Sequence, residues 1–541
     1  MKNLPILLAI TIVIALPFLL RKQNQTVVRS DDTLIVITPH DEGIRHEFEV
    51  AFAAHYLETT GRTIDIDWRV IGGTSEIIRY IQSTYTNNFR NYWENELGKP
   101  WNAEVQNSFM NRRITLDDSP QDDTPAEAAK RAFLNSNVTC GIDILFGGGS
   151  YDFIQQAAAG TLVPFASPEA LATMLPKSSV PLRFAGEPFY DKQALWAGAV
   201  LSQFGIIYNL HSLQRLDIPT IPSSWEDLTD PRYLGELAIS DPIQSGSSTK
   251  AFEMIVQEQM LRRVQQAGAE LSEQETLREV KAGWDQSMQV IQRICANARY
   301  FTDSSKKPSI DVSAGECAAG MSIDFYGRFQ AETLQNRTGS DRFSYITPVG
   351  GSTVSVDPIA LLRGAPHAEM ATLFIQFVLS EQGQKLWNWK PGTPDGPETY
   401  ALRRSPMLRQ LYDAKYADVR SDPHINPYSE AGSFVYHPEW TGRLFSPLRF
   451  IIKTAFIDPH QELSEAWAAI QSARQQGRLD DANRALAVFS ELDKIHYEQA
   501  ATHIGSILNK RTKIEEVQLA RTLTLHFRDQ YQRATQIANG Q

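Results

Sequence analysis

The stretch that decides the fold runs from Ile218 to Phe252 and reads IPTIPSSWEDLTDPRYLGELAISDPIQSGSSTKAF. Its centre, Leu237 to Ile239, is short, apolar and flanked by turn-forming residues, which predicts a buried strand. A Gly/Ser turn over Ser245 to Thr249 follows this strand and leads into a helical run from Lys250. Because the start of a helix directs several backbone N–H groups at one point, this turn is suited to hold an anion.

Four submotifs follow one another in this stretch: P-x-x-W-x-D-L from Pro222, P-x-Y-x-G from Pro231, the strand, and D-P-x-x-S-G-S from Asp241. In this order they resemble the second lobe of an extracellular solute-binding protein of the ABC-importer class, in the branch that includes ferric-iron-binding proteins. A later run from Pro366 to Leu386, P-H-x-E…F-x-x-F-x-L-S-x-x-G-Q-x-L, is similar to the late helix of the same family. The resemblance implies a two-lobed α/β fold of the periplasmic-binding-protein kind (type II), with two hinge crossings and a ligand cleft between the lobes.

Length, charge and cysteine content narrow the class of protein. The chain has 541 residues. A domain with a single hydrophobic core is usually shorter than this, so we expect two or three domains. Its formal net charge of −11 argues against a nucleic-acid partner. Cys140, Cys295 and Cys317 form no zinc pattern, and in an oxidising compartment Cys295 and Cys317 are candidates for a disulfide, with three buried thiols as the alternative.

The amino terminus predicts export. An apolar or hydroxylic run from Pro5 to Leu20 is bracketed by Lys2 and by Arg21-Lys22. We expect residues 1–25 to be an uncleaved signal-anchor, with a removed signal peptide as the alternative. Either one places the remaining chain outside the cytoplasmic membrane, in contact with it through this segment only.

Strands and helices alternate at the start of the chain. A continuous apolar strand at Leu34 to Thr38 precedes a helix that ends at Gly61, and the next strand, Ile64 to Ile71, precedes a second helix. This βαβα order predicts a doubly wound parallel sheet. We divide the chain into residues 1–25, lobe 1 (32–200, with a partly flexible surface insertion at about 87–137), lobe 2 (206–345), a return to lobe 1 (346–400) and a C-terminal helical extension (401–541).

Two β-rich runs, 196–209 and 345–362, are the expected hinge crossings. The C-terminal extension repeats apolar residues at i+4 steps along one helix face, at Leu519, Leu523, Phe527 and Tyr531. We expect this face to pack against lobe 1, and the alternative is a docking surface for a partner.

The carboxyl ends of the predicted strands carry the candidate site, because ligands of open α/β sheets bind there. Three of these ends are Gly/Ser/Thr-rich turns at helix starts, which favour a small anion. The candidate ligand-binding residues at all the strand ends considered are His40, Gly73, Thr74, Ser75, Gly149, Ser150, Ser245, Gly246, Ser247, Ser248, Asp324, Tyr326, Arg328 and Asp357. Arg328 is the expected cation of the cleft, since a guanidinium binds phosphate or carboxylate through two hydrogen bonds.

An iron site is the alternative within transport. Ferric-binding relatives present adjacent tyrosines where this chain has Phe325-Tyr326, so one expected phenolate is missing. His40, Asp324 and Tyr326 remain as candidate Fe³⁺ ligands, because hard Fe(III) favours oxygen donors. If the ligand is not iron, we expect no metal or cofactor.

The sequence contains neither a G-x-S-x-G elbow nor a G-x-x-x-x-G-K-[ST] loop, so we expect no catalytic residues. The resemblance implies a periplasmic component that captures a small phosphate- or carboxylate-bearing anion by hinge closure and delivers it to an ABC permease. A ligand-sensing module and a periplasmic hydrolase are the alternatives of other classes.

Overall fold

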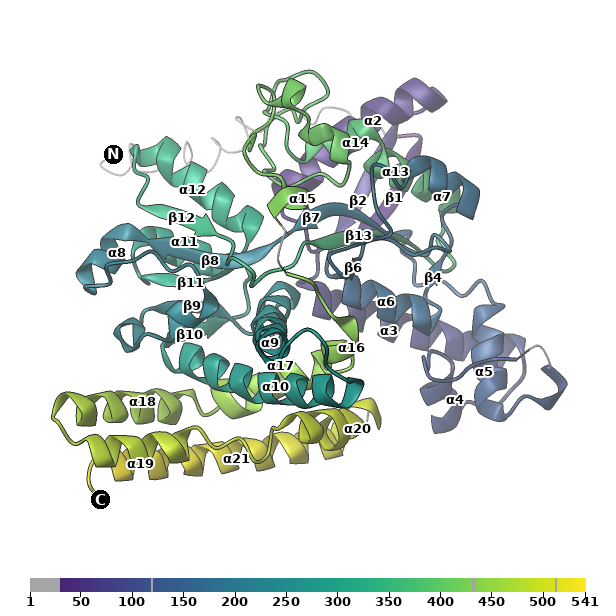
Figure 1. The fold of residues 1–541 in the computed structure, drawn as a ribbon. Coiled ribbons are helices and arrows are strands. Elements are labelled where there is room, and N and C mark those ends of the chain that lie inside the picture. The colour runs from purple at the N-terminus through teal and green to yellow at the C-terminus, as the bar shows by residue number, and fades with distance from the viewer. Residues whose placement is uncertain (1–29, 118–119, 431–433, 511–512) are drawn as a thin grey trace, which may run out of the picture.

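The computed structural model describes residues 30–117, 120–430, 434–510 and 513–541, and the hydrophobic segment over residues 1–25 lies outside them. Two β-sheets with helices packed on them organise the described residues into two lobes, which confirms the predicted α/β fold class (Figure 1). Within this part of the chain, no helix combines the length and the apolarity that a membrane crossing requires.

The first sheet has the order β2-β1-β3-β13-β4, with β7 paired to β13. β1 is parallel to β2 and β3, whereas β13 is antiparallel to β3, β4 and β7. The sheet is therefore mixed and not wholly parallel as predicted, because β7 leaves for the other lobe and β13 returns from it. The strands are β1 (Asp32–Ile37), β2 (Ile64–Arg69), β3 (Ile144–Phe146), β4 (Leu162–Val163), β7 (Ala197–Ser202) and β13 (Ser355–Leu362).

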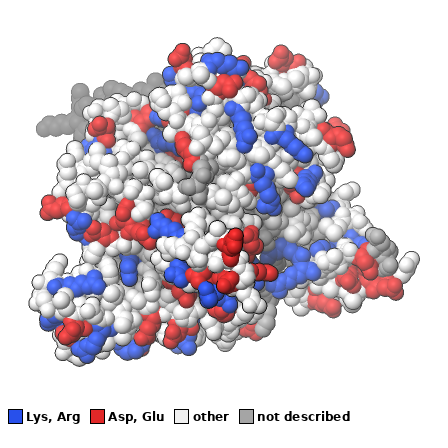
Figure 2. Space-filling model, in the orientation of Figure 1, with Lys and Arg blue, Asp and Glu red and all other residues white. Residues whose placement is uncertain are grey.

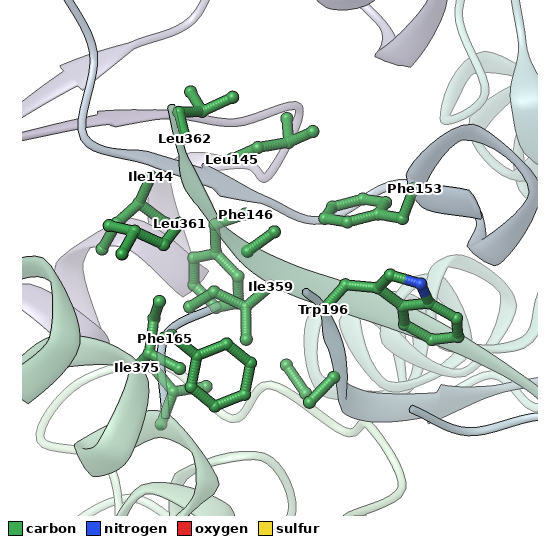
Figure 3. Packing of buried hydrophobic residues seen from close by; sticks show 14 of the residues in the cluster. Ile144, Leu145, Phe146, Phe153, Phe165, Trp196, Ile359, Leu361, Leu362 and Ile375 are labelled. Carbon is green, nitrogen blue, oxygen red and sulfur yellow. The ribbon is translucent and has the colours of Figure 1, made fainter. Parts of the chain in front are cut away.

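Helices pack on this sheet and bury its apolar side chains. Phe146 of β3, Ile359 of β13 and Ile375 of α13 meet in the core of the first lobe (Figure 3). The helices are α2 (Glu42–Thr60), α3 (Thr74–Asn91), α4 (Ala103–Ser108), α5 (Pro125–Leu134), α6 (Ser150–Ala159), α7 (Pro168–Met174), α13 (Ala368–Leu379) and α14 (Glu381–Leu386), and a hairpin of β5 (Arg183–Phe184) and β6 (Glu187–Pro188) joins them.

The predicted insertion at 87–137 has a core of its own. It consists of the end of α3, a π-helical turn (Tyr92–Glu96), α4 and α5. Phe89 stacks on Phe109 with ring centroids 4.6 Å apart, and Phe133 meets both edge-on. All three rings are buried, so the aromatic cluster extends the core of the first lobe and is not a surface feature.

The second sheet has the order β10-β9-β11-β8-β12. The stretch from Ile218 to Phe252 supplies its strand β9 and the start of helix α9, as predicted, and Trp225 and Leu228 of the preceding turn are buried. The elements are β8 (Phe204–Asn209), β9 (Leu237–Ser240), β10 (Ala298–Thr302), β11 (Ala319–Ile323), β12 (Phe343–Ile346), α8 (Leu210–Arg215), α9 (Gly246–Ala267), α10 (Glu273–Ala296), α11 (Lys307–Ala314) and α12 (Asp324–Thr338).

The chain passes between the lobes at both predicted places, from β7 to β8 and from β12 to β13. A Cβ at Gly205 would lie 2.2 Å from the carbonyl oxygen of Ile346, so only glycine lets these two crossings run so close together. A third change of lobe was not predicted. Tyr428 packs on the core of the first lobe, whereas Phe434 belongs to the core of the second.

The C-terminal helices pack on the second lobe, so the prediction that they pack on the first is wrong. Figure 1 shows α18, α19 and α21 as a layer along α10. The indole N–H of Trp284 in α10 donates to the carbonyl of Ile495 at 2.8 Å, and that of Trp467 donates to Asn297 at 3.1 Å. The helices on the second lobe are α16 (Pro438–Thr441), α17 (Phe445–Ile451), α18 (His460–Gln475), α19 (Leu479–Phe489), α20 (Gly505–Lys510) and α21 (Lys513–Ala538). The short helix α15 (Pro427–Glu430) comes before the change of lobe, and its Tyr428 packs on the first lobe.

The predicted apolar face of α21 is buried along its length, at Leu519, Leu523, Phe527 and Tyr531. The amphipathic pattern therefore identified the buried face correctly but gave no information about its partner. Residues 401–426, placed in the helical extension by the sequence, are largely irregular and lie against the first lobe.

The three cysteines are buried free thiols, so the candidate disulfide between Cys295 and Cys317 is absent. The two residues lie in different hydrophobic clusters of the second lobe. Burial raises the pKa of both the Cys140 and the Cys317 thiol to about 11, which keeps them protonated at neutral pH.

Candidate ligand-binding cleft

A cavity of about 370 Å³ lies between the two lobes, at the carboxyl ends of their strands. The first lobe lines it with the turn after β1 and the starts of α3 and α6. The second lobe lines it with the start of α9, the turn before α11 and the start of α12. The cavity therefore occupies the position at which an open α/β fold is expected to bind a ligand.

Three helix N-termini from the two lobes meet at this cavity. The N-caps of α3 and α6 are Gly73 and Gly149, which have no side chain to accept the first N–H groups of their helices. The N-cap of α9 is Ser245, whose hydroxyl accepts from the N–H of Ser248 at 3.1 Å. The positive ends of these helices and their uncapped N–H groups together favour a negatively charged ligand.

The lobes touch beside the cavity. A Cβ at Gly73 in the first lobe would lie 3.0 Å from the carbonyl oxygen of Gln244 in the second. The structure is therefore a closed arrangement, in which the turn before α9 and the start of α3 are in near contact.

A buried charged cluster forms the floor of the cleft on the side of the first lobe. Arg404, fully buried, donates to Asp357 at 2.5 Å and to the hydroxyl of Ser202 at 2.6 Å. Its guanidinium also lies over the ring of Phe325 from the second lobe, 4.2 Å from the centroid. Asp357, a predicted ligand residue, lines the cavity with its charge already balanced by Arg404.

His40 lines the same floor as a neutral imidazole. Burial, followed by the positive charges of Arg404 and Arg45, lowers its pKa well below the usual value. Nε2 lies 3.4 Å from Arg404 Nη1, and because arginine only donates, Nε2 accepts and the proton resides on Nδ1. This buried Nδ1 has no hydrogen-bond partner among the described residues.

Two lysines bring positive charge to the cavity. Lys250 of α9 pairs with Glu187 of β6 at 2.6 Å and with Glu253 at 2.8 Å, so its charge is used to join the lobes. Lys306 at the start of α11 is exposed and has no ion-pair partner within the part of the chain that the structure describes. Lys306 is thus the lining cation that a ligand can engage.

The structure brings most of the predicted site residues together. Those that line the cavity are His40, Gly73, Thr74, Gly149, Ser150, Ser245, Gly246, Ser247, Tyr326 and Asp357. Ser75 and Ser248 follow lining residues in α3 and α9 but do not line it, and the Ser248 hydroxyl donates to the carbonyl of Ser240 at 2.6 Å.

Asp324 and Arg328 do not belong to this cavity, which corrects the prediction that Arg328 is its cation. The two side chains form an ion pair of 3.2 Å within α12. Arg328 lies over the ring of Tyr345 and lines a separate cavity of about 560 Å³ beside the hinge. The sequence contained the relevant signal, because an Asp and an Arg four residues apart pair when the segment is helical.

The candidate iron ligands are only partly brought together. His40 and Tyr326 line the cavity, whereas Asp324 is paired with Arg328 outside it. Burial raises the pKa of the Tyr326 phenol, which opposes formation of a phenolate. Across the described ranges, no group of three or more His, Cys, Asp and Glu residues is arranged to hold a metal ion.

Sequence reasoning missed Lys250, Arg404, Tyr151 and Phe445. Lys250 stands one residue after the Gly/Ser turn, so the start of a helix at Gly246 was a usable signal. Arg404 and Phe445 enter from irregular or short elements far along the chain, and no periodic pattern connects them with the cleft.

The carboxyl of Asp152, which also lines the cleft, predicts a pH-dependent stability. Burial raises its pKa to about 6, against a weaker opposing effect of Arg449. The folded state then holds this proton more tightly than the unfolded state, so this group costs stability as pH rises from about 4 to 6. In the ligand-free protein, Asp152→Asn should raise the free energy of unfolding at pH 7.5 by about 1–2 kcal/mol, allowing for partial exposure.

Urea denaturation at several pH values measures this effect. The gain from Asp152→Asn should shrink towards pH 5 and vanish near pH 4. Asp480→Asn is the matched control, because Asp480 also lies in the first turn of a helix but is exposed. A gain that is equal at pH 5 and pH 7.5 would contradict the buried-carboxylate explanation.

Two α/β lobes joined by hinge strands, with a cleft at the carboxyl ends of both sheets, define the class of two-lobed binding proteins. Residues 177–396 match the model of the family described as bacterial extracellular solute-binding protein. This match confirms the predicted resemblance to solute-binding proteins over these residues. Proteins of this family bind solutes.

Known relatives are similar to this chain over part of its length. It is 26% identical over 250 residues to an uncharacterized protein of Haemophilus influenzae, covering 46% of this chain and 61% of the relative. It is also 26% identical over 186 residues to the phosphoglycerate transport regulatory protein PgtC of Salmonella typhimurium, covering 34% of this chain and 39% of PgtC. The chain thus spans less than two thirds of either relative.

Solved structures of periplasmic binding proteins are also similar. The protein AfuA of Actinobacillus pleuropneumoniae, with fructose-6-phosphate bound, is 17% identical, with a TM-score of 0.43, and the match covers 66% of this chain and 82% of AfuA. The apo ferric ion-binding protein A of Pasteurella haemolytica is 11% identical, with a TM-score of 0.47 and coverage of 78% and 96%.

Proposed function

We propose that this protein is the extracytoplasmic solute-binding component of an ABC transporter and that it captures a small organic anion bearing a phosphate or carboxylate group. The observation that carries the proposal is the meeting of the N-termini of α3, α6 and α9 at one cavity between the lobes. N–H groups and helix dipoles from both lobes stabilise a bound anion only when the cleft is closed. Ligand binding therefore favours closure, and a permease that distinguishes the closed form receives the loaded protein.

Several other lining groups support an anion, although the lining also includes the carboxyls of Asp152 and Asp303. Lys306 offers an exposed ammonium that has no ion-pair partner among the described residues. Hydroxyls at Thr74, Ser150 and Ser247 add donors around the same space. The name of the relative PgtC concerns phosphoglycerate transport, which supports a phosphate-bearing ligand.

Figure 2 shows acidic and basic side chains interspersed over one face of the molecule, without a continuous basic surface there. Together with the net charge of −11, this supports a small-molecule ligand and not a nucleic acid. Attachment to the membrane through residues 1–25 remains part of the proposal.

Ser247→Asp tests the sign of the ligand charge. Aspartate in the first turn of α9 suits the helix dipole, so folding should be preserved. A carboxylate at the cavity wall should nevertheless repel a bound anion and weaken binding about tenfold to a hundredfold. Native mass spectrometry of the purified protein identifies any co-purified ligand, and calorimetry with glycerol 3-phosphate, citrate, inorganic phosphate and ferric citrate measures affinity.

Ser272→Asp is the matched control, because Ser272 is the N-cap of α10 and lies outside the cavity lining. It should bind these compounds like the wild type. If Ser247→Asp binds anions normally while Tyr326→Phe abolishes the binding of ferric citrate and its visible colour, the anion proposal fails and the iron alternative replaces it.

A further inference from the structure

A segment of the C-terminal extension contacts both lobes at the cleft. We call residues 434–457 the strap; they comprise α16, α17 and a π-helical stretch (Ile452–Ile457). The strap lies beyond the residues that match the solute-binding family model, which end at 396. It therefore adds to the family domain a part whose role the match does not explain.

The beginning of the strap bridges the lobes. The N–H of Tyr436 donates to the carbonyl of Ala185 in the β5–β6 hairpin of the first lobe at 2.8 Å. Its phenol donates to Glu253 of α9 in the second lobe at 2.9 Å. One residue of the strap thus holds an element of each lobe.

Helix α17 presents different faces to the two lobes. Leu444, Leu448 and Ile451 are buried in the core of the second lobe, and Lys453 pairs with Asp241 at the carboxyl end of β9 at 3.0 Å. These contacts fix the helix to the second lobe. Phe445 points away from that core and lines the ligand cavity.

Across the cavity wall, Phe445 meets the first lobe. Its ring stacks on Tyr151 of α6, with centroids 4.3 Å apart and an interplanar angle of 28°. The Tyr151 hydroxyl also lies 3.3 Å from the hydroxyl of Ser446. Since Tyr151 moves with the first lobe and Phe445 with the second, the pair forms only when the lobes are closed.

We propose that the strap is a third wall of the ligand cleft and that Tyr151 and Phe445 act as an aromatic clamp, which holds the closed state and contacts the carbon part of the ligand. The contact with ligand rests on the proposed function, whereas the clamp does not. Opening the cleft separates the two rings and exposes both to water, so the clamp slows ligand release. An aromatic wall beside the anion-binding helix ends favours an organic anion over a bare inorganic one.

Phe445→Leu and Tyr151→Leu test this role in the full chain, because leucine retains apolar bulk but cannot stack. Phe489→Leu is the matched control, since Phe489 stacks on Trp467 in the C-terminal layer, away from the cleft. The first test needs no ligand. It measures hydrogen–deuterium exchange of residues 149–156 and the small-angle X-ray scattering of each protein. Both cleft variants should show faster exchange at the start of α6 and a larger radius of gyration, and the control should show neither.

The second measurement is the dissociation rate of glycerol 3-phosphate in stopped-flow experiments. Each cleft variant should release this probe about three- to tenfold faster, because it lacks the stabilisation that one aromatic pair provides. The double variant should be no worse than either single variant, because each one already breaks the same pair. Additive effects, or ligand-free exchange and scattering equal to the control, would overturn the clamp.

If the wild type does not bind glycerol 3-phosphate, the proposed ligand class fails for that probe. The ligand-free exchange and scattering results then decide the clamp on their own.

Discussion

Replacing Arg404 with methionine should lower the free energy of unfolding by about 3–5 kcal/mol, a large share of the stability of a typical domain. Arg404 is fully buried and is the ion-pair partner of Asp357, at 2.5 Å. Methionine fills much of the same space but leaves the Asp357 carboxylate without a counter-charge in the floor of the cleft. It also removes the donors that serve Ser202 and His40. The cost therefore combines the lost counter-charge of a part-buried carboxylate with the loss of buried donors that a fully buried arginine supplies.

Chemical denaturation of the ligand-free protein measures this loss. Arg215→Met is the matched control, because Arg215 makes two hydrogen bonds of 2.8 Å to Glu236 but is half exposed. Solvent screens that pair, so its removal should cost at most about 1 kcal/mol. Similar losses in the two variants would show that the Arg404 cluster is not the buried charge centre described above.

Lys250→Met should have a comparable effect, a loss of about 3–5 kcal/mol at neutral pH. Its ammonium lies between Glu187 and Glu253, both fully buried, and 3.8 Å from the centroid of the Tyr436 ring. Burial alone lowers the pKa of Lys250, but the two carboxylates more than offset this and raise it. Without the lysine, two buried negative charges face each other across the lobe boundary.

The loss in Lys250→Met should depend on pH. Burial already raises the pKa of Glu187 even with Lys250 present. In the variant, the unpaired carboxylates should bind protons more tightly when folded than when unfolded, so the deficit should shrink as pH falls from 7.5 towards 5. Denaturation midpoints at both pH values test this expectation.

Glu187→Gln should partly restore stability in the Lys250→Met background, because it removes one of the unpaired charges. The same substitution in the wild type should destabilise, since it weakens the link to Lys250. If Glu187→Gln has the same effect in both backgrounds, the two residues are not coupled as the 2.6 Å distance indicates.

The sequence predicted local features well, because these depend on short-range patterns. Continuous apolar runs identified β1 and β9, and the helix-ending glycine Gly61 was placed correctly. The Gly/Ser turns at the starts of α3, α6 and α9 were also predicted correctly, because glycine and serine are favoured residues where a turn leads into a helix. These turns supply most of the cavity lining.

Long-range arrangements were not predictable in the same way. The apolar face of α21 was visible in the sequence, but any apolar groove satisfies such a face, and the choice of α10 was not encoded in its periodicity. Arg404 reaches His40 across 364 positions from a segment without regular structure. Arg328 was misplaced because the residues after β11 were interpreted as a strand end, whereas they begin α12 and pair within it.

The third change of lobe sets a mechanical limit on the molecule. Two lobes that are joined by two hinge crossings can rotate about the axis through those crossings. A third connection limits how far the two lobes can separate where it joins them. Here Tyr428 is held by the first lobe and Phe434 by the second. The chain between these two residues can span at most roughly 20 Å when fully extended. However the lobes move, these two anchor points cannot separate further without unpacking one of them.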